Sequence, residues 1–182
     1  CYAESQEMQY VTNGKRKFIW LPRIGVEQFF NLEEDPNDKF DWEQRFTTQE
    51  KVDGSLVLLY YWQGDWHLNT RNSFSKGEVN DSGITWRDLF EQALGKKLSE
   101  IGNNLSPKFT YVFELCSPYN KVVRNYPVPV VYLLSIFNMD SGEEVDPFAI
   151  RAYYQNNFFS KMFPKVEYPT LEVLQNVDEV LQ

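Results

Sequence analysis

Short runs of apolar residues, separated by turn-forming residues, dominate the chain and predict β-strands. Residues 110–115 and 130–137 are apolar almost throughout, which is typical of buried strands. Two pairs of runs flank turn signals and predict hairpins: residues 9–11 with 17–21 around Asn13 and Gly14, and residues 55–62 with 66–71 around residues 63–65. A further turn is expected at residues 140–142. Strands are therefore expected along much of the chain.

Helical patterns are fewer. Residues 86–94 place four apolar side chains on one face, and Gly95 then favours a helix end. Three more helices are predicted: one over residues 26–32, one from Asp146 with Pro147 in its first turn, and one from Thr170 to the end of the chain. These patterns together predict an α+β domain with mainly antiparallel strands and with helices on the outside.

Composition and charge narrow the function. Hydrophobic residues are 42% of the chain, which is ample for a packed core, and no apolar run approaches the roughly 20 residues of a membrane helix. The single histidine, His67, excludes a zinc site built on several histidines. Two cysteines, Cys1 and Cys116, favour a reducing, cytoplasmic or otherwise intracellular setting. The net charge of -8 disfavours broad binding of duplex nucleic acid, so only a local basic groove would serve.

The segment EKVDGSL, residues 50–56, has the strongest chemical signal. Lys51 stands just before a predicted strand, which fixes where its amine points, and Gly54 lets the backbone approach a ligand closely. A free lysine, with a pKa near about 10.4, is almost fully charged at neutral pH, so a nucleophilic lysine needs nearby cations, a divalent metal or desolvation. Glu114 lies between apolar neighbours, where an unpaired charge is costly, so a partner or a ligand is expected.

Four motifs resemble those of ATP-dependent RNA ligases of the phage RNA ligase 1 branch, within the lysine nucleotidyltransferase superfamily. They are LPRIGVEQFFNLEEDP at residues 21–36, KVDGS at 51–55, TRNSF at 70–74 and FELCSPYNKVV at 113–123. Their order and spacing agree with those of the family. The resemblance implies a nucleotidyltransferase (adenylyltransferase) domain with an ATP-grasp-like ligase core, which would occupy residues 1–182 and be truncated at both ends.

The resemblance also implies roles for individual residues. Lys51 would take AMP from ATP, while Asp53 and Glu114 would orient water on Mg²⁺ or Mn²⁺, or hold the ribose. The remaining implied contacts are Glu50, Gly54, Ser55, Arg71 and Tyr132 (or Val131) with ATP, and Arg23, Lys121 and Arg124 with RNA or phosphate. AMP would pass to the 5′-phosphate of an RNA, and a 3′-hydroxyl would then seal the strand. The protein would act as a monomer away from membranes, in the host cell if it is viral.

Two departures from the family pattern leave alternatives open. No Arg-Gly pair is found at residues 1–7, and the Glu-Gly-x-Val element with its two-lysine strand is missing up to Gln182. Lacking those lysines, the chain could also be a catalytically silent module that binds nucleotide or RNA ends. A DNA ligase or capping-type transferase fits the lysine motif as well. Lys-x-Asp-Gly also occurs by chance in surface turns, so an unrelated β-rich interaction domain remains a further interpretation.

Overall fold

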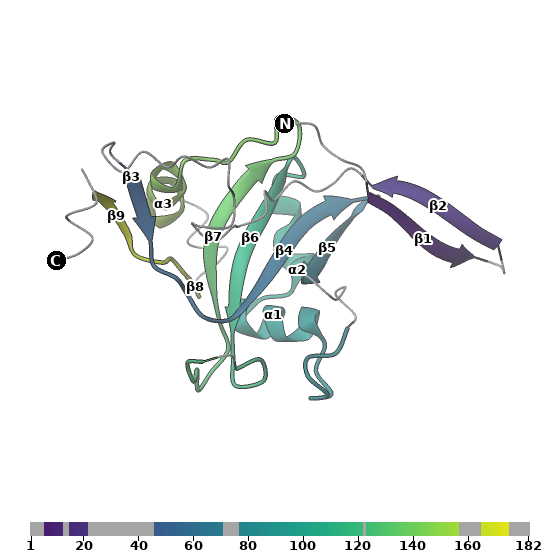
Figure 1. Ribbon diagram of the computed structural model, residues 1–182, viewed down its shortest axis with the longest axis horizontal. Coiled ribbons are helices and arrows are strands. Elements are labelled where there is room, and N and C mark those ends of the chain that lie inside the picture. Colours follow the sequence, from purple (N-terminus) through teal and green to yellow (C-terminus); the bar gives the residue numbers. More distant parts are fainter. Residues whose placement is uncertain are drawn as a thin grey trace, which may run out of the picture.

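A five-stranded sheet forms the centre of the molecule (Figure 1). The computed structural model describes residues 6–12, 15–21, 46–70, 77–121, 123–156 and 165–174. The sheet has the order β5-β4-β6-β7-β8, with bounds β4 Ser55–Trp62, β5 Asp65–Thr70, β6 Phe109–Cys116, β7 Val130–Asn138 and β8 Val166–Glu167. All its neighbours are antiparallel except β7 and β8, which run parallel. The predicted α+β class with mainly antiparallel strands is confirmed.

Both predicted hairpins are present. Strand β1 (Gln6–Thr12) pairs with β2 (Lys15–Leu21) across residues 13–14, and β4 pairs with β5 across residues 63–64. Gln63 and Gly64 have φ of 50° and 90°, so both adopt the left-handed conformation that a tight two-residue hairpin requires. His67 is half-buried on β5, with its Nε2 atom 3.1 Å from the carbonyl oxygen of Trp62, as expected for a strand residue.

Helix α1 (Trp86–Leu94) closes one face of the sheet, with the bounds that the sequence predicts. The Thr85 hydroxyl accepts the N–H of Asp88 at 3.1 Å, and Gly95, with φ of 73°, ends the helix. The apolar side of α1 packs on the sheet. There the rings of Phe90 and Phe113 pack edge to face, with their centroids 5.1 Å apart. The shared core contains these buried side chains: Val57, Leu59, Leu68, Leu89, Phe90, Leu94, Phe113, Leu115, Val131 and Leu133.

Three more elements complete the described helices. Helix α2 (Leu98–Ile101) runs into the 3-10 helix η1 (Gly102–Asn104), and α3 (Pro147–Asn156) follows the turn at residues 140–142. The Asp146 carboxylate accepts the N–H of Phe148 at 2.9 Å, which confirms the predicted start of α3. None of the helices in the described ranges combines the length and apolar character that crossing a bilayer requires.

The predicted helix from Thr170 to the end of the chain is wrong over its described part. Residues Leu171–Leu174 form strand β9, which pairs antiparallel with β3 (Phe46–Gln49). The backbone of this segment therefore bonds to a strand more than a hundred residues earlier, and such a partner outweighs a local capping signal. The helix predicted at residues 26–32 lies outside the described residues.

Candidate active site

Lys51 lies in the connection from β3 to β4, at one end of the sheet. In Figure 1 this connection follows the lower edge of the molecule, where the β6–β7 loop also lies. The segment is anchored on both sides of the lysine. The N–H of Glu50 donates to the carbonyl of Thr170 at 2.9 Å, and the N–H of Gly54 donates to Glu114 Oε1 at 2.9 Å. The Lys51 side chain is exposed and forms no hydrogen bond or ion pair with the described part of the chain.

Gly54 is required by packing between strands. A Cβ atom built on Gly54 would lie 2.5 Å from the carbonyl oxygen of Leu115 and 2.7 Å from Sγ of Cys116. Any side chain would therefore push the start of β4 away from β6. The sequence interpretation, in which this glycine admits a ligand, missed the closer reason: it lets the lysine segment bond directly to Glu114.

Glu114 faces the half-buried side of the sheet. In the strand register it stands opposite Leu56 on β4 and Tyr132 on β7. Desolvation raises the pKa of Glu114 above its usual value, although the Gly54 N–H and the Lys51 charge act in the lowering direction. Among the described residues only Gly54 donates to this carboxylate, and Oε2 receives no hydrogen bond. Glu114 thus has the partner that the sequence predicts, but that partner leaves one oxygen open.

Asp53 fastens the β6–β7 loop to the lysine segment. Its Oδ2 atom accepts the backbone N–H groups of Val123 at 2.8 Å and Arg124 at 2.9 Å. The bond from the Arg124 N–H is the main reason that the pKa of Asp53 lies below its usual value, and the charge of Lys51 adds to the lowering. The Oδ1 atom has no such bond within the described ranges, so one oxygen also remains open here.

Asn120 is a site residue that sequence reasoning did not assign. It is buried, and its Nδ2 donates to the Ser55 hydroxyl at 2.8 Å and to the Leu115 carbonyl at 2.7 Å. The Ser117 hydroxyl bonds in turn to the Asn120 side chain. Asn120 therefore links the first residue of β4 to the end of β6. Its place in the SPYN motif was visible, but the motif alone does not say what its amide contacts.

Glu50 connects three parts of the site. Its carboxylate accepts the Thr170 hydroxyl at 3.3 Å and lies 3.8 Å from the Arg124 guanidinium. Both partners of this ion pair are well exposed, so it contributes little to stability. Thr170 therefore contacts the site as the residue before a strand, and not as the helix cap that was predicted.

The two candidates for the adenine face behave differently. Val131 is fully buried in the core, whereas Tyr132 is half-buried on the same side of the sheet as Glu114. Desolvation raises the pKa of the Tyr132 hydroxyl. Of the two, only Tyr132 has a side chain in reach of a ligand bound on that side.

The remaining predicted contacts are placed only in part. Lys121 and Arg124 are exposed on the β6–β7 loop, while Arg23 and Arg71 lie outside the described residues. The structure thus brings Glu50, Lys51, Asp53, Gly54, Ser55, Glu114 and Arg124 to one end of the sheet. Within the described ranges no group of three or more His, Cys, Asp or Glu side chains could hold a metal ion. A cation here would need ligands from a substrate and water beside Asp53 and Glu114.

A cavity of about 350 Å³ lies at the other end of the sheet. It is lined by the β4–β5 turn, by Trp66 of β5, by Arg87 of α1 and by residues of α2 and η1, including Leu98 and Gly102. Trp66 donates its indole N–H to the carbonyl of Gly102 at 3.0 Å. None of the predicted site residues lines this cavity.

Comparison with known proteins identifies the family. A family model described as RNA ligase matches residues 14–182. A protein of Autographa californica nuclear polyhedrosis virus, assigned as a bifunctional polynucleotide kinase/RNA ligase, is 28% identical over 174 residues, or 86% of this chain. An RNA ligase of Rhodothermus phage RM378 is 31% identical over 100 residues, or 50% of this chain. The chain spans about a quarter of each of these relatives, 23% in both cases.

Solved structures agree on the fold. A mutant Naegleria gruberi RNA ligase with ATP and Mn has a TM-score of 0.56 at 16% identity, over 76% of this chain and 40% of that one. Another, with AMP and Mn, has a TM-score of 0.58 at 14% identity, over 97% of this chain and 65% of that one. At such low identity the likeness shows a shared fold alone. Since the family model covers nearly all of the sequence, the chain belongs to the RNA ligase family.

Proposed function

We propose that this chain is the adenylyltransferase core of an ATP-dependent RNA ligase. Lys51 Nζ attacks the α-phosphorus of ATP, a phosphorus–nitrogen bond forms, and pyrophosphate leaves. The AMP then passes from Lys51 to the 5′-phosphate of an RNA strand. A 3′-hydroxyl attacks that phosphate, which seals the strand and releases AMP. The observation that carries the proposal is the anchored lysine beside a half-buried carboxylate with an open oxygen.

Positioning is the first contribution of the chain to this reaction. The bonds at Glu50 and Gly54 hold the backbone on both sides of Lys51, so the amine is presented from a fixed point. Holding a nucleophile in line with its target removes much of the entropic part of the barrier. Ser55, bonded to Asn120, continues this fixed backbone into β4. The adenine and ribose would then be held by Glu50, Tyr132 and Arg71.

Asp53 and Glu114 fit a divalent cation that is shared with ATP. Each carboxylate keeps one oxygen without a hydrogen bond among the described residues, and Mg²⁺ and Mn²⁺ favour such oxygens while retaining water. The cation would neutralise charge on the phosphates. The ATP and Mn in the Naegleria structures support this assignment. Lys121, Arg124 and Arg23 would contact the phosphates of the RNA, and the protein would work as a monomer.

The direct test is covalent labelling of the protein with α-³²P-ATP in the presence of Mg²⁺ or Mn²⁺. We expect a labelled adduct that survives a denaturing gel, with ATP preferred over GTP. Lys51→Ala removes the nucleophile, so the adduct should fall below detection. Lys108→Ala is the matched control, because Lys108 is equally a surface lysine but lies at the far end of β6.

Two results would redirect the proposal. If ATP binds at equilibrium but no adduct forms, the chain is a silent module that only holds nucleotide or RNA ends. If GTP labels Lys51 more efficiently than ATP, a capping-type transferase is the better assignment. A label that persists in Lys51→Ala would show that the nucleophile is a different residue.

A further inference from the structure

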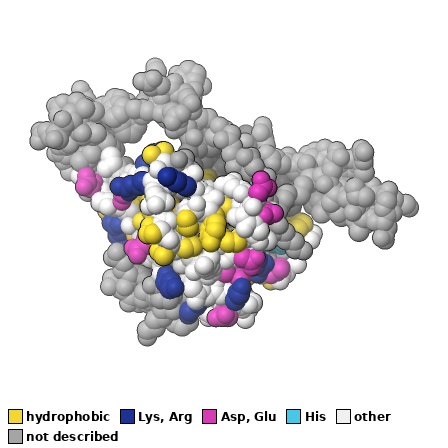
Figure 2. Space-filling model, turned by 90° about the horizontal axis from the view of Figure 1, so that it is seen from below, with side chains coloured by type: hydrophobic (Ala, Val, Ile, Leu, Met, Phe, Trp, Pro, Cys, Tyr) yellow, Lys and Arg dark blue, Asp and Glu magenta, His cyan; other side chains and the backbone are white. Residues whose placement is uncertain are grey.

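The β6–β7 loop presents apolar and basic side chains to solvent at the lysine end of the sheet. Val123 and Val128 are 77% and 65% exposed, and Tyr119 is 41% exposed. Lys121 and Arg124 are also exposed there. Figure 2 views the molecule from below and shows hydrophobic side chains gathered there, with Lys and Arg as well as Asp and Glu side chains around them. We call these five side chains the loop surface.

The backbone beneath the loop surface is held firmly. The carbonyl of Tyr119 accepts Nδ2 of Asn80 at 3.0 Å, and the N–H of Tyr119 donates to the Ser117 hydroxyl at 3.2 Å. Farther along, the N–H groups of Val123 and Arg124 donate to Asp53. Exposed apolar side chains on a fixed backbone lose little entropy when they bind, which is typical of a prepared contact surface.

The charge of this segment is opposite to that of the protein. The chain has a net charge of -8, but between Glu114 and Asp140 its sequence contains two cations and no carboxylate. Lys121 forms no ion pair with the described residues. Such a stretch attracts phosphates locally, although two cations are too few to hold a duplex by charge.

We infer that the loop surface is the docking site for a single-stranded RNA end, with a base stacked on Tyr119 and the backbone phosphates at Lys121 and Arg124. Unpaired bases expose the faces that an aromatic ring and apolar side chains can contact, whereas a duplex buries them. Asp53 joins this loop to the segment of Lys51, so a docked end would lie beside the adenylylated lysine. The inference rests on the proposed function.

The test is fluorescence anisotropy with a labelled 12-nucleotide RNA carrying a 5′-phosphate, which needs no catalysis. Tyr119→Ala should weaken binding by about 5- to 100-fold, the usual effect of losing one stacked base. Lys121→Ala should reduce the slope of log affinity against log salt by about 0.7. Tyr61→Ala and Lys108→Ala are matched controls, since both residues are exposed but lie toward the opposite end of the sheet. They should bind within about twofold of the parent.

Three results would overturn the inference: an unchanged affinity in both loop variants, equal losses in the controls, or a duplex that binds as tightly as the single strand. Sedimentation of the same proteins tests whether a second copy of the chain, instead of RNA, covers the loop surface. If the parent self-associates and Tyr119→Ala abolishes this while RNA affinity stays unchanged, the loop surface is a contact between copies of the chain. Labelling of Lys51 by ATP is measured separately, so a failure of docking can be told from a failure of the proposed reaction.

Discussion

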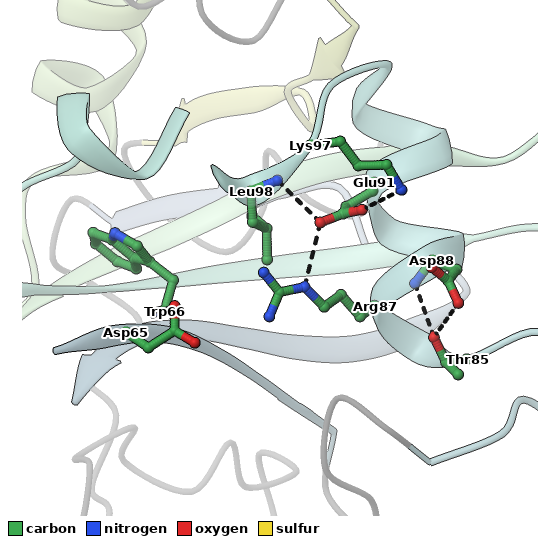
Figure 3. A network of polar contacts seen from close by, with 8 residues as sticks. All are labelled: Asp65, Trp66, Thr85, Arg87, Asp88, Glu91, Lys97 and Leu98. Atoms are coloured by element: carbon green, nitrogen blue, oxygen red, sulfur yellow. Dashed lines mark hydrogen bonds and ion pairs between the residues drawn. The ribbon is translucent and has the colours of Figure 1, made fainter. Parts of the chain in front are cut away.

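Two carboxylates, Glu91 on α1 and Glu114 on β6, lie on elements that share one core, but they differ in how many hydrogen bonds their oxygens receive. Glu91 of α1 is only 7% exposed, yet all its bonds are internal (Figure 3). Its Oε1 accepts from Arg87 at 3.3 Å and from the N–H of Leu98 at 3.0 Å, and Oε2 accepts from Lys97 at 2.7 Å. Glu114 is less buried than Glu91, yet among the described residues it accepts only one hydrogen bond, from the N–H of Gly54.

The two pKa values move in opposite directions as a result. Burial acts to raise the pKa of Glu91, but the bonds from Lys97, Leu98 and Arg87 outweigh it, and the pKa lies below its usual value. At Glu114 desolvation prevails, and the pKa lies above its usual value. A carboxylate whose oxygens all receive hydrogen bonds or ion pairs stabilises the fold that holds it. A desolvated carboxylate with an oxygen that receives no hydrogen bond lowers the stability of the fold, and such a group is typical of a ligand-binding site.

The described cavity lies beside Glu91, the carboxylate whose oxygens are both bonded. The cavity of about 350 Å³ is lined by Arg87 and Leu98, both of which already bond to Glu91. The open oxygens instead lie near Lys51. Under the proposed function, unmet hydrogen-bonding capacity therefore indicates the reactive end more directly than the volume of a cavity does.

The largest effect on stability should come from Glu91→Ala. It leaves the buried N–H of Leu98 without an acceptor and removes two ion pairs whose cations, Arg87 and Lys97, are partly exposed, so the free energy of unfolding should fall by about 1–3 kcal/mol. Urea denaturation measures this. The yield of the AMP adduct per folded molecule should stay unchanged. A loss of adduct that exceeds the loss of folded protein would place Glu91 in the reaction and break the comparison.

Glu114→Gln should have the converse effect. The amide keeps the oxygen that accepts from Gly54 but loses the charge, so adduct formation should slow by roughly 10- to 100-fold, as for other groups that orient a metal-bound water. Stability at neutral pH should be equal or higher, because a desolvated charge has been removed. Glu143→Gln, on an exposed turn, is the control. Full activity in Glu114→Gln would refute the role assigned to Glu114.

The smallest effect is a difference in pH dependence. Because the pKa of Glu91 is lowered by folding, its contribution to stability is present above the usual carboxyl pKa, about 4.3, and is lost as the pH falls below it. The pKa of Glu114 is raised, so its penalty is absent in acid and appears as the pH rises through that value. The free energy of unfolding of Glu91→Gln and of Glu114→Gln should each be compared with that of the parent from about pH 7 to pH 3. As the pH falls, the two differences should change in opposite directions. Parallel changes would contradict the contrast between the two sites.

Local signals determined much of this protein. The β4–β5 hairpin, helix α1 and the Asp146 cap depend on residues a few positions apart, and their patterns were therefore visible in the sequence. The motif around Lys51 and the apolar setting of Glu114 likewise predict the reactive end that we propose. Both signals depend only on residues that are neighbours in the chain, so one sequence is enough to recognise them.

Only the tertiary structure decided what those segments contact. The pairing of β9 with β3, the bond from Asn120 to Ser55 and the attachment of the β6–β7 loop to Asp53 join residues 65 or more positions apart. No local pattern encodes such a partner, because each bond depends on where the sheet places the two backbones. The sequence itself therefore determined which chemical groups are present, and the packing of β4 against β6 decided which of their oxygens receive no hydrogen bond among the described residues.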